Sequence, residues 1–397
     1  MGVKPRPLSR VILPFMKTVL INGIVLTPDE RITSSQIVVE NARITGILPA
    51  GPVGGGAHTI DVQGNYIVPG LIDLHIHGAG GFDTMDATPQ AIHTIARFIA
   101  GHGVTAYLPT TVAASQHDTQ KAIETVSSTP LPAEGAHHLG IHLEGPYLNH
   151  VFCGAQPLQH LRAADPAEYV GWLGKKGVRL MTVAPEIDGV PDLIRVGRNK
   201  GVEFAIGHST ASYDQALQAA DLGLRQATHT FNGMPPLHHR TPGLLGAVLS
   251  DDRLLAQVIA DGIHVHPAVV KLLVRAKGID HTILITDAIR ATGMPDGSYA
   301  LGDQQVQVKD GIARTEVGGL AGSTLTMDRA LQNMMKYAGL SLQQALPMAT
   351  RVPAEALGLN QQKGQIAPGF DADIVVLDES CQVRLTMVAG QVVFRTL

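Results

Sequence analysis

The middle of the chain alternates short apolar runs with stretches of helical periodicity, and this alternation restricts the fold more than any other feature of the sequence. Such alternation is typical of parallel βα units. Eight runs are predicted to be strands, the number that closes a (β/α)₈ barrel, at residues 67–75, 104–109, 139–143, 178–183, 202–206, 225–228, 254–259 and 282–286. Helices are predicted between them at 89–100, 117–126, 213–220 and 267–276. The sequence therefore predicts a (β/α)₈ barrel domain over residues 67–365, and the site candidates described below make it the metal-dependent catalytic domain.

Both ends of the chain show a different pattern, in which short alternating strands are separated by turns. Residues 16–66 contain Asn-Gly and Asn-Ala-Arg turns, and residues 366–397 repeat the pattern after a Pro-Gly pair. We therefore predict a small β-sandwich domain built from both chain ends. Residues 1–15 are expected to be an N-terminal extension, and Asp310-Gly311 is expected to turn a hairpin over the barrel mouth.

The composition excludes several classes of protein. Hydrophobic residues make up 45% of the 397 residues and charged residues 16%, which fits a compact enzyme. The formal net charge is -4 and no basic cluster occurs, so no nucleic-acid partner is expected. No apolar run reaches membrane-spanning length, so no membrane partner is expected either. The two cysteines, Cys153 and Cys381, are far apart, which excludes a disulfide framework and fits a cytoplasmic location.

Side chains able to bind a metal or transfer a proton follow the predicted strands at the same end each time. In a barrel, the carboxyl ends of the strands form the mouth, where catalytic groups lie. His75 and His77 are two residues apart and would share one face of a strand. The other strand-end candidates are Glu144, His208, His229, His264 and Asp287. Each alone is also compatible with a buried histidine or a helix cap, but their repetition at one end of the strands favours a site.

These candidates supply only nitrogen and oxygen ligands. Zinc is the first expectation, with iron, cobalt or manganese as alternatives. We expect one or two divalent ions per chain, and Glu144 would be shared by a His75/His77 ion and a His208/His229 ion. A bound ion makes hydroxide available near neutral pH and polarises a carbonyl. Asp287, a further ligand candidate, would pass the proton to a leaving nitrogen, so we predict hydrolysis of an amide or a related carbon–nitrogen bond.

Ordered motifs from about Leu20 to Val393 resemble those of the amidohydrolase superfamily and, within it, of the N-acetylglucosamine-6-phosphate deacetylase family. They include PGLIDLHIHGAGGFD, GIHLEGPYLN, GHSTASYDQA, ATHTFNGMPPLHHRTPG, IADGIHVHP, ITDAI, LAGSTLTM and GQIAPGFDADIVVLD. The resemblance implies removal of the acetyl group of N-acetylglucosamine 6-phosphate, giving glucosamine 6-phosphate and acetate. It also implies that Glu144, His208 and His229 bind the hydrolytic metal and that Asp287 is the catalytic acid/base. Retention of His75 and His77 resembles the members that hold a second ion.

The resemblance further implies substrate contacts from three segments. They are Asn232 and Gly233, then His264, then the backbone of Leu320, Ala321 and Gly322. Arg240 matches an arginine that reaches across a homodimer interface to the sugar phosphate, a role that suits a permanently charged guanidinium.

Gln156 departs from the family pattern, because a histidine usually stands at this position. Glutamine can donate a hydrogen bond to a sugar hydroxyl or to the acyl oxygen, but it cannot become cationic. The expected substrate contact at Gln156 therefore leaves the sugar epimer open. The alternatives are an N-acetylgalactosamine-6-phosphate deacetylase, an amidohydrolase for another N-acyl substrate and a non-catalytic sugar-phosphate sensor. The intact Asp287 counts against the sensor.

Overall fold

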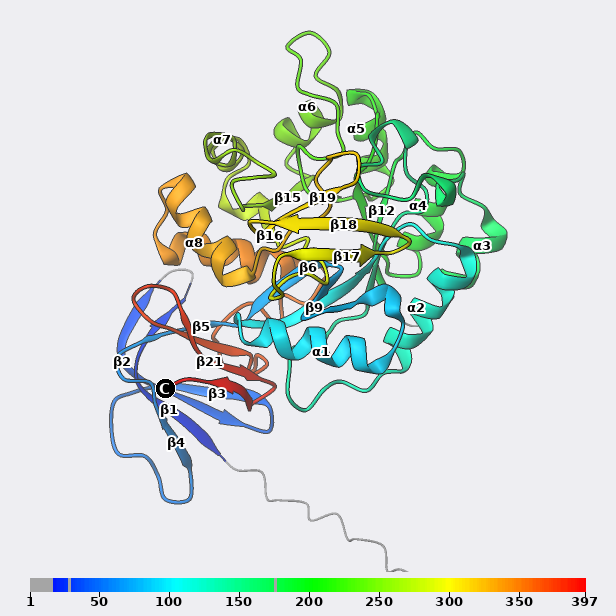
Figure 1. Ribbon diagram of the computed structural model, residues 1–397. Coiled ribbons are helices and arrows are strands. Elements are labelled where there is room, and N and C mark those ends of the chain that lie inside the picture. The colour runs from blue at the N-terminus through cyan, green and yellow to red at the C-terminus, as the bar shows by residue number, and fades with distance from the viewer. Residues whose placement is uncertain (1–16, 28–29, 175–176) are drawn as a thin grey trace, which may run out of the picture.

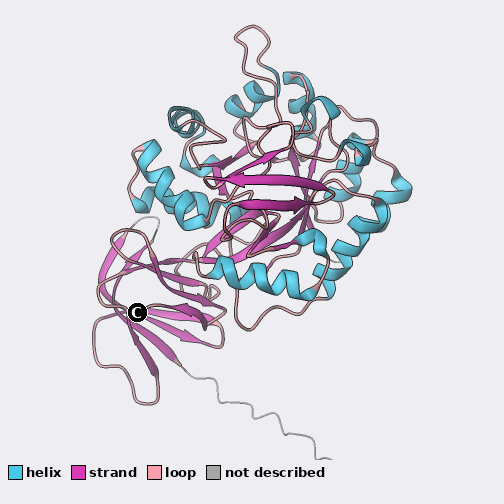
Figure 2. Cartoon of the chain, viewed as in Figure 1, coloured by secondary structure: helices cyan, strands magenta, loops and turns pink. Residues whose placement is uncertain are grey.

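The structure is a computed structural model that describes residues 17–27, 30–174 and 177–397. The predicted extension, residues 1–15, lies outside these residues. Figures 1 and 2 show a barrel of strands surrounded by helices, with a separate sheet beside it that contains both the early strands and the C-terminal ones. In the described part of the chain, no helix is long and apolar enough to cross a membrane.

Eight parallel strands form the barrel, which confirms the predicted fold class. Neighbouring strands pair in parallel, and their order follows the sequence. The strands are β6 (Leu71–Ile76), β9 (Val104–Thr111), β11 (Ile141–Glu144), β12 (Val178–Val183), β13 (Glu203–Ile206), β14 (Gln226–Ala227), β15 (Leu255–Ile259) and β16 (Thr282–Ile285). A two-residue strand, β10 (His137–His138), pairs with β9 beside them.

The barrel closes where β16 returns to β6. The backbone N–H of Asp287 donates to the carbonyl of His75 at 2.9 Å, and that of His77 donates to Ala288 at 2.8 Å. Below them, the buried carboxylate of Asp73 accepts from the hydroxyl of Thr286 at 2.6 Å and from its N–H at 3.3 Å. Burial of the Asp73 carboxylate raises its pKa to about 6, although these bonds partly oppose the shift. Closure thus joins the two strands that carry His75, His77 and Asp287.

Helices cover the outside of the barrel, and their starts are marked by capping residues. Thr88 and Ser115 each accept a backbone N–H three residues on, and Ser212 forms a reciprocal capping box with Gln215. Within the described residues, the longer helices are α1 (Pro89–Ala100), α2 (Gln116–Ser128), α3 (Pro166–Leu173), α4 (Val190–Arg198), α5 (Tyr213–Asp221), α6 (Gly243–Ser250), α7 (Pro267–Lys277) and α8 (Met327–Ala338). Two short ones follow, α9 (Leu342–Ala345) and α10 (Arg351–Ala356).

The two chain ends build one eight-stranded sheet around its own apolar core. Its strands are β1 (Thr18–Leu26), β2 (Arg31–Glu40), β3 (Arg43–Pro49), β4 (His58–Asp61), β5 (Tyr66–Pro69), β20 (Ile374–Leu377), β21 (Val383–Val388) and β22 (Gln391–Arg395). The layers of the predicted sandwich are thus parts of one continuous sheet, and the edge strand β3 returns to contact the segment before β20. The core includes Leu20, Ile37, Ile60 and Met387.

The predicted strand at 67–75 is two strands. It breaks at Gly70, where β5 ends in the small sheet and β6 begins the barrel. Residues 67–69 therefore pair with β20 in the small sheet. We propose that the boundary between the two domains lies after Pro69.

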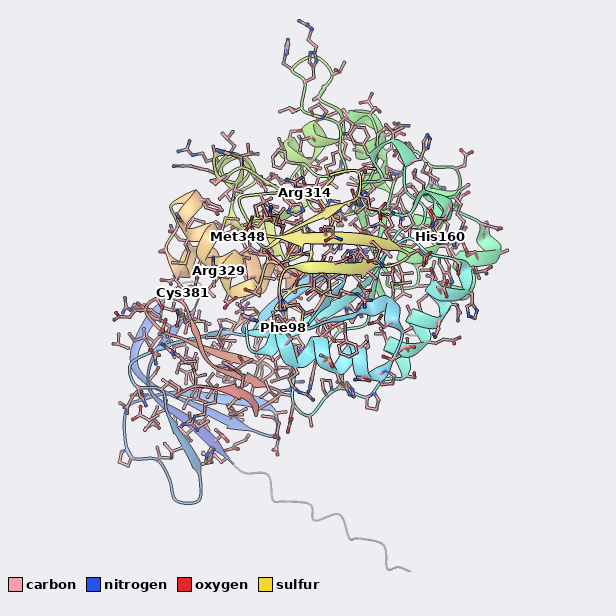
Figure 3. The ribbon with its side chains drawn as sticks, viewed as in Figure 1. Phe98, His160, Arg314, Arg329, Met348 and Cys381 are labelled. Carbon is pink, nitrogen blue, oxygen red and sulfur yellow. The ribbon has the colours of Figure 1, made fainter. Side chains whose placement is uncertain are left out.

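A three-stranded antiparallel sheet lies across the barrel mouth. It consists of β17 (Gly297–Leu301), β18 (Gln304–Lys309) and β19 (Ile312–Thr315), and Asp310-Gly311 forms the predicted hairpin turn. Its apolar face packs Leu301 and Val306 with Val112 and Ile289 of the barrel. At its far end, His160 contacts Asp303 through Nε2 and Oδ2 at 2.8 Å, and Figure 3 labels His160 there. We refer to β17–β19 as the mouth sheet.

Candidate active site

Three of the predicted site residues lie two positions beyond a strand end and have a left-handed backbone. They are His208 after β13 (φ 48°), His229 after β14 (φ 31°) and Asp287 after β16 (φ 50°). This conformation is uncommon for residues other than glycine and clusters at functional sites. Here the backbone turns sharply as each strand ends, and the three side chains gather at the barrel axis with His75, His77 and Glu144.

Glu144 lies between two pairs of histidines, one on each of its oxygens. Oε1 is 3.2 Å from Nε2 of His208 and 3.0 Å from Nε2 of His229. Oε2 is 3.6 Å from Nε2 of His75 and 3.3 Å from Nε2 of His77. All five side chains are buried. Glu144 therefore belongs to two groups of side chains that could each hold a metal ion, one with His75 and His77 and one with His208 and His229.

The hydrogen bonds of His208 and His229 show which ring nitrogen of each faces Glu144 and is available to bind a cation there. Nδ1 of His208 lies 2.9 Å from the carbonyl oxygen of Phe152, and Nδ1 of His229 lies 3.2 Å from that of Asn232. A carbonyl only accepts, so each Nδ1 carries the hydrogen and each Nε2 presents a lone pair. The two Nε2 atoms are 3.1 Å apart, and both face Oε1 of Glu144. Converging acceptors of this kind need a cation between them, so the residues fit a divalent metal.

The imidazoles of His75 and His77 are held by fewer hydrogen bonds than those of His208 and His229. Their Nε2 atoms are 3.2 Å apart, but among the described residues neither Nδ1 has a hydrogen-bond partner. Asp287 faces this group, with Oδ1 3.4 Å from His75 and 3.2 Å from His77. The two groups thus differ in how firmly the protein orients their imidazoles.

Both carboxylates of the site are held in the ionised form. Burial alone would raise the pKa of Glu144, but the electrostatic attraction of His75 and the close contacts with His208 and His229 hold this pKa well below its usual range. Burial would likewise raise the pKa of Asp287, but His75 and His77 lower it to about 2. Ionised oxygens are the form that binds a cation or accepts a proton.

A cavity of about 150 Å³ opens onto these residues and brings together most of the predicted substrate contacts. His264 is oriented within it, because Nδ1 contacts Oδ2 of Asp261 at 2.7 Å. Val112, Gly154, Ala155 and Leu301 also line it and were not predicted, since nothing in the local sequence distinguishes them. The predicted residues on its wall are His77, Glu144, Gln156, His208, His229, Asn232, Gly233, His264, Asp287, Leu320 and Gly322.

Two predicted substrate contacts lie away from this wall. The side chain of Ala321 is buried beneath the mouth sheet, and its N–H is donated to the carbonyl of Ala313 at 3.2 Å. Arg240 is exposed in the loop before α6, which projects from the barrel in Figure 1. Arg240 therefore does not line the cavity of its own chain.

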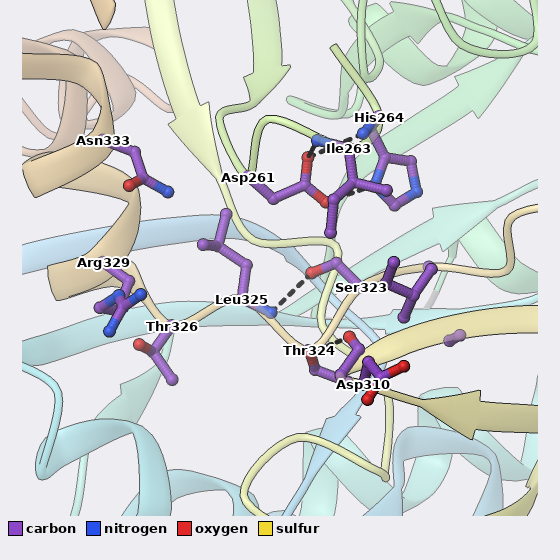
Figure 4. A pocket seen from close by; sticks show the side chains of 14 residues that line it. Asp261, Ile263, His264, Asp310, Ser323, Thr324, Leu325, Thr326, Arg329 and Asn333 are labelled. Atoms are coloured by element: carbon purple, nitrogen blue, oxygen red, sulfur yellow. Dashed lines mark hydrogen bonds and ion pairs between the residues drawn. The ribbon is translucent and has the colours of Figure 1, made fainter. Parts of the chain in front are cut away.

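A larger cavity, of about 340 Å³, lies beside the first and shares His264 and Gly322 with it. Figure 4 shows its wall, with Asp261 and His264 on one side and Arg329 and Asn333 on another. Neither the His75/His77 pair nor the His208/His229 pair lines it.

Comparison with known proteins identifies the family. The model of the family described as "Amidohydrolase family" matches residues 66–393. This chain belongs to the amidohydrolase family. The amidohydrolase is 40% identical over 374 residues to the N-acetylglucosamine-6-phosphate deacetylase of Vibrio furnissii, covering 93% of this chain and 90% of the relative. It is 38% identical over 328 residues to the N-acetylgalactosamine-6-phosphate deacetylase of Escherichia coli O157:H7, covering 82% and 87%.

A solved structure of a deacetylase has a similar fold. A mutant N-acetyl-D-glucosamine-6-phosphate deacetylase of Mycobacterium smegmatis, in complex with N-acetyl-D-glucosamine-6-phosphate, is 33% identical. It aligns with a TM-score of 0.88 over 96% of this amidohydrolase and 100% of that chain. The family is metal-dependent, and the two histidine groups on Glu144 could hold such ions.

His142 is a buried residue of this amidohydrolase that the sequence reasoning missed. Its ring packs edge-on against His75, with centroids 4.8 Å apart, and Nε2 lies 2.7 Å from the hydroxyl of Thr182. Burial, and then the neighbouring His75, lower its pKa well below the ordinary value, so the ring is neutral. A signal was available, since His142 is two residues from Glu144 on one strand and so shares its face.

Proposed function

We propose that this amidohydrolase is a cytoplasmic, metal-dependent deacetylase that converts N-acetylglucosamine 6-phosphate to glucosamine 6-phosphate and acetate. The observation that carries the proposal is the placement of Glu144 between two histidine pairs, with Asp287 3.2 Å from one of them. The similarity to deacetylases over most of the chain supports the substrate class. Cys153 and Cys381 are both free, which fits a reducing compartment.

The chain's own residues divide the chemistry between them. Glu144, His208 and His229 would hold one divalent ion, zinc first among the alternatives, and His75 and His77 would hold a second one with Glu144. A bound ion supplies an acidified water and polarises the acetyl carbonyl. Asp287 would take a proton from the water while the water oxygen forms a bond to the acetyl carbon. The same carboxyl then gives the proton to the sugar nitrogen as the carbon–nitrogen bond breaks.

The cavity wall supplies contacts that would orient the sugar. Nδ1 of His264 is occupied by Asp261, so Nε2 is the ring atom left for the substrate. Asn232, Gly233, Leu320 and Gly322 provide amide and backbone groups around it. Together these groups would hold the N-acetyl carbonyl near the metal ligands.

The phosphate needs a cation that the cavity does not provide. Among the described residues that line it, there is no lysine or arginine. We propose that Arg240 of the partner subunit in a homodimer supplies this charge. Arg240 is exposed and is not among the residues that line the cavity of its own chain, which supports this assignment.

The proposal is tested by measuring amine release from a panel of substrates. The panel contains N-acetylglucosamine and N-acetylgalactosamine, each with and without a 6-phosphate, together with an N-acetyl amino acid. We expect the highest kcat/KM for N-acetylglucosamine 6-phosphate and a large loss when the phosphate is absent.

Other outcomes of the panel would identify the alternatives. Preference for N-acetylgalactosamine 6-phosphate would reassign the epimer, an assignment that the relative from Escherichia coli makes worth testing. Turnover of the N-acetyl amino acid alone would replace the sugar proposal. Binding of sugar phosphates with no amine release from metal-loaded protein would support a sensor and overturn the enzyme.

A further inference from the structure

Gln156 is fixed at both ends of its side-chain amide. Its Oε1 accepts the backbone N–H of Ala113 at 2.7 Å, and its Nε2 donates to Oε2 of Glu144 at 2.6 Å. Because Ala113 N–H can only donate and an ionised carboxylate can only accept, these partners determine which end of the amide is oxygen. The side chain is 5% exposed, so water competes little for either bond.

The oxygen of Glu144 that Gln156 holds belongs to the His75/His77 group. Oε2 lies 3.6 Å and 3.3 Å from the Nε2 atoms of these two histidines, whereas Oε1 faces His208 and His229. A carboxylate oxygen has two lone-pair directions, so Oε2 can accept from Gln156 and still bind an ion. Gln156 therefore acts on one half of the shared ligand.

We propose that Gln156 is a positioning residue that keeps Glu144 extended across both metal groups, so that the His75/His77 group retains a carboxylate oxygen. Without this bond, the terminal torsion of Glu144 is soft, since such sp³–sp² torsions have broad minima. The carboxylate would then turn both oxygens toward the His208/His229 group. That group keeps its own orienting bonds, because Phe152 and Asn232 hold its imidazoles independently.

This inference deepens the proposed function, since it rests on Glu144 as a shared metal ligand. It gives Gln156 a role beyond the predicted substrate contact. Because the amide nitrogen has a second hydrogen and Gln156 lines the cavity, a substrate contact remains compatible with the metal role. The two roles are separated by measuring metal binding without any sugar.

The test titrates metal-depleted protein with Zn²⁺ against a chromophoric chelator, for the wild type and for Gln156→Leu. We expect two dissociation constants in the wild type. In Gln156→Leu, the weaker one should rise by about tenfold or more, as is typical when a ligand loses its hydrogen-bonding partner. The tighter one, assigned to the His208/His229 group, should change by less than about threefold.

Two controls make the assignment specific. Gln257→Leu removes a different buried glutamine, which bonds to Gln226 at 2.9 Å and does not line the cavity, and should leave both constants unchanged. In a His75→Asn, His77→Asn background, one constant should remain and Gln156→Leu should no longer matter. Melting temperatures of all variants report any general loss of stability.

Several results would overturn the inference. They are equal weakening of both constants, no change in either, or a wild type that takes up a single ion. A raised KM for the sugar phosphate with unchanged metal binding would leave Gln156 as a substrate contact only. None of these results bears on whether the wild type deacetylates the sugar, which the substrate panel decides separately.

Discussion

At the barrel mouth, His208, His229 and Asp287 each turn the chain through a left-handed backbone as a strand ends. The sequence placed His208, His229 and Asp287 at strand ends, because each follows an apolar run in the same position. It carries only a weak signal for their left-handed backbone, because histidine and aspartate adopt this conformation more often than most other residues with a side chain but still rarely do so. That conformation depends on the surrounding structure. For Asp287, backbone bonds to His75 and Ser323 fix the turn.

The proposed proton transfer at Asp287 is tested by Asp287→Asn. The amide keeps the shape of the side chain but cannot accept the proton, so kcat should fall by roughly 10²–10⁴-fold. The ion at Glu144, His208 and His229 should remain, because Asp287 faces the other histidine pair. Steady-state kinetics and metal analysis of the purified variant check both expectations. A loss of less than about tenfold would move the proton to another group, with His264 as the next candidate.

At the scale of helices and strands, the sequence predicts helix starts well and the division of one apolar run into two strands poorly. The helices α1, α2, α5 and α7 begin within one residue of their predicted starts, where a capping residue or proline marks the helix. The sequence does not show the break at Gly70, because residues 67–69 and 71–72 are apolar on either side of it and both resulting strands are largely buried. What separates them is the pairing of β5 with β20, a contact between distant parts of the chain that no local pattern shows.

The mouth sheet is predicted to shape the cavity through its β17–β18 turn. A Cβ at Gly302 (φ +53°) would lie 2.6 Å from Cγ2 of Val112, which lines the cavity. Gly302→Ala should therefore displace Val112 from its place on the cavity wall. Forced overpacking typically strains the surrounding side chains and backbone by about 1–3 kcal/mol, so we expect kcat/KM to fall by roughly tenfold. The matched control is Gly318→Ala, also at positive φ (+88°) but with no atom within 4 Å of the added Cβ. Equal kinetics for the two variants would show that the turn does not control the site.

For the whole molecule, the proposed phosphate contact requires a positive charge from outside the cavity. The catalytic cavity has no lysine or arginine on its described wall, and two arginines outside it are candidates. Arg329 lies on the wall of the neighbouring cavity of the same chain (Figure 4). Arg240 lies in the projecting loop before α6 and would act on a second copy. A sequence motif suggested Arg240, but no single-chain pattern can show which subunit receives a side chain.

Arg240→Ala and Arg329→Ala distinguish these candidates. If Arg240 binds the phosphate, its loss should lower kcat/KM for N-acetylglucosamine 6-phosphate. The lost transition-state stabilisation should be roughly 2–5 kcal/mol, as for a desolvated charge pair. It should hardly affect the unphosphorylated sugar. Arg329→Ala, the matched loss of one arginine, should leave both substrates unchanged. The reverse result would place the phosphate in the cavity beside His264 within one chain.

Mixed dimers decide whether Arg240 acts across the subunit interface. A chain with Arg240→Ala retains its own Asp287, and a chain with Asp287→Asn retains its Arg240. When the two exchange subunits, each mixed dimer should contain one complete site, made from Asp287 of the first chain and Arg240 of the second. Activity should therefore reappear on mixing two nearly inactive preparations, and it should follow the fraction of mixed dimers measured by native mass spectrometry. If subunits exchange and no activity returns, Arg240 does not serve the neighbouring site, because complementation requires that the two residues come from different chains.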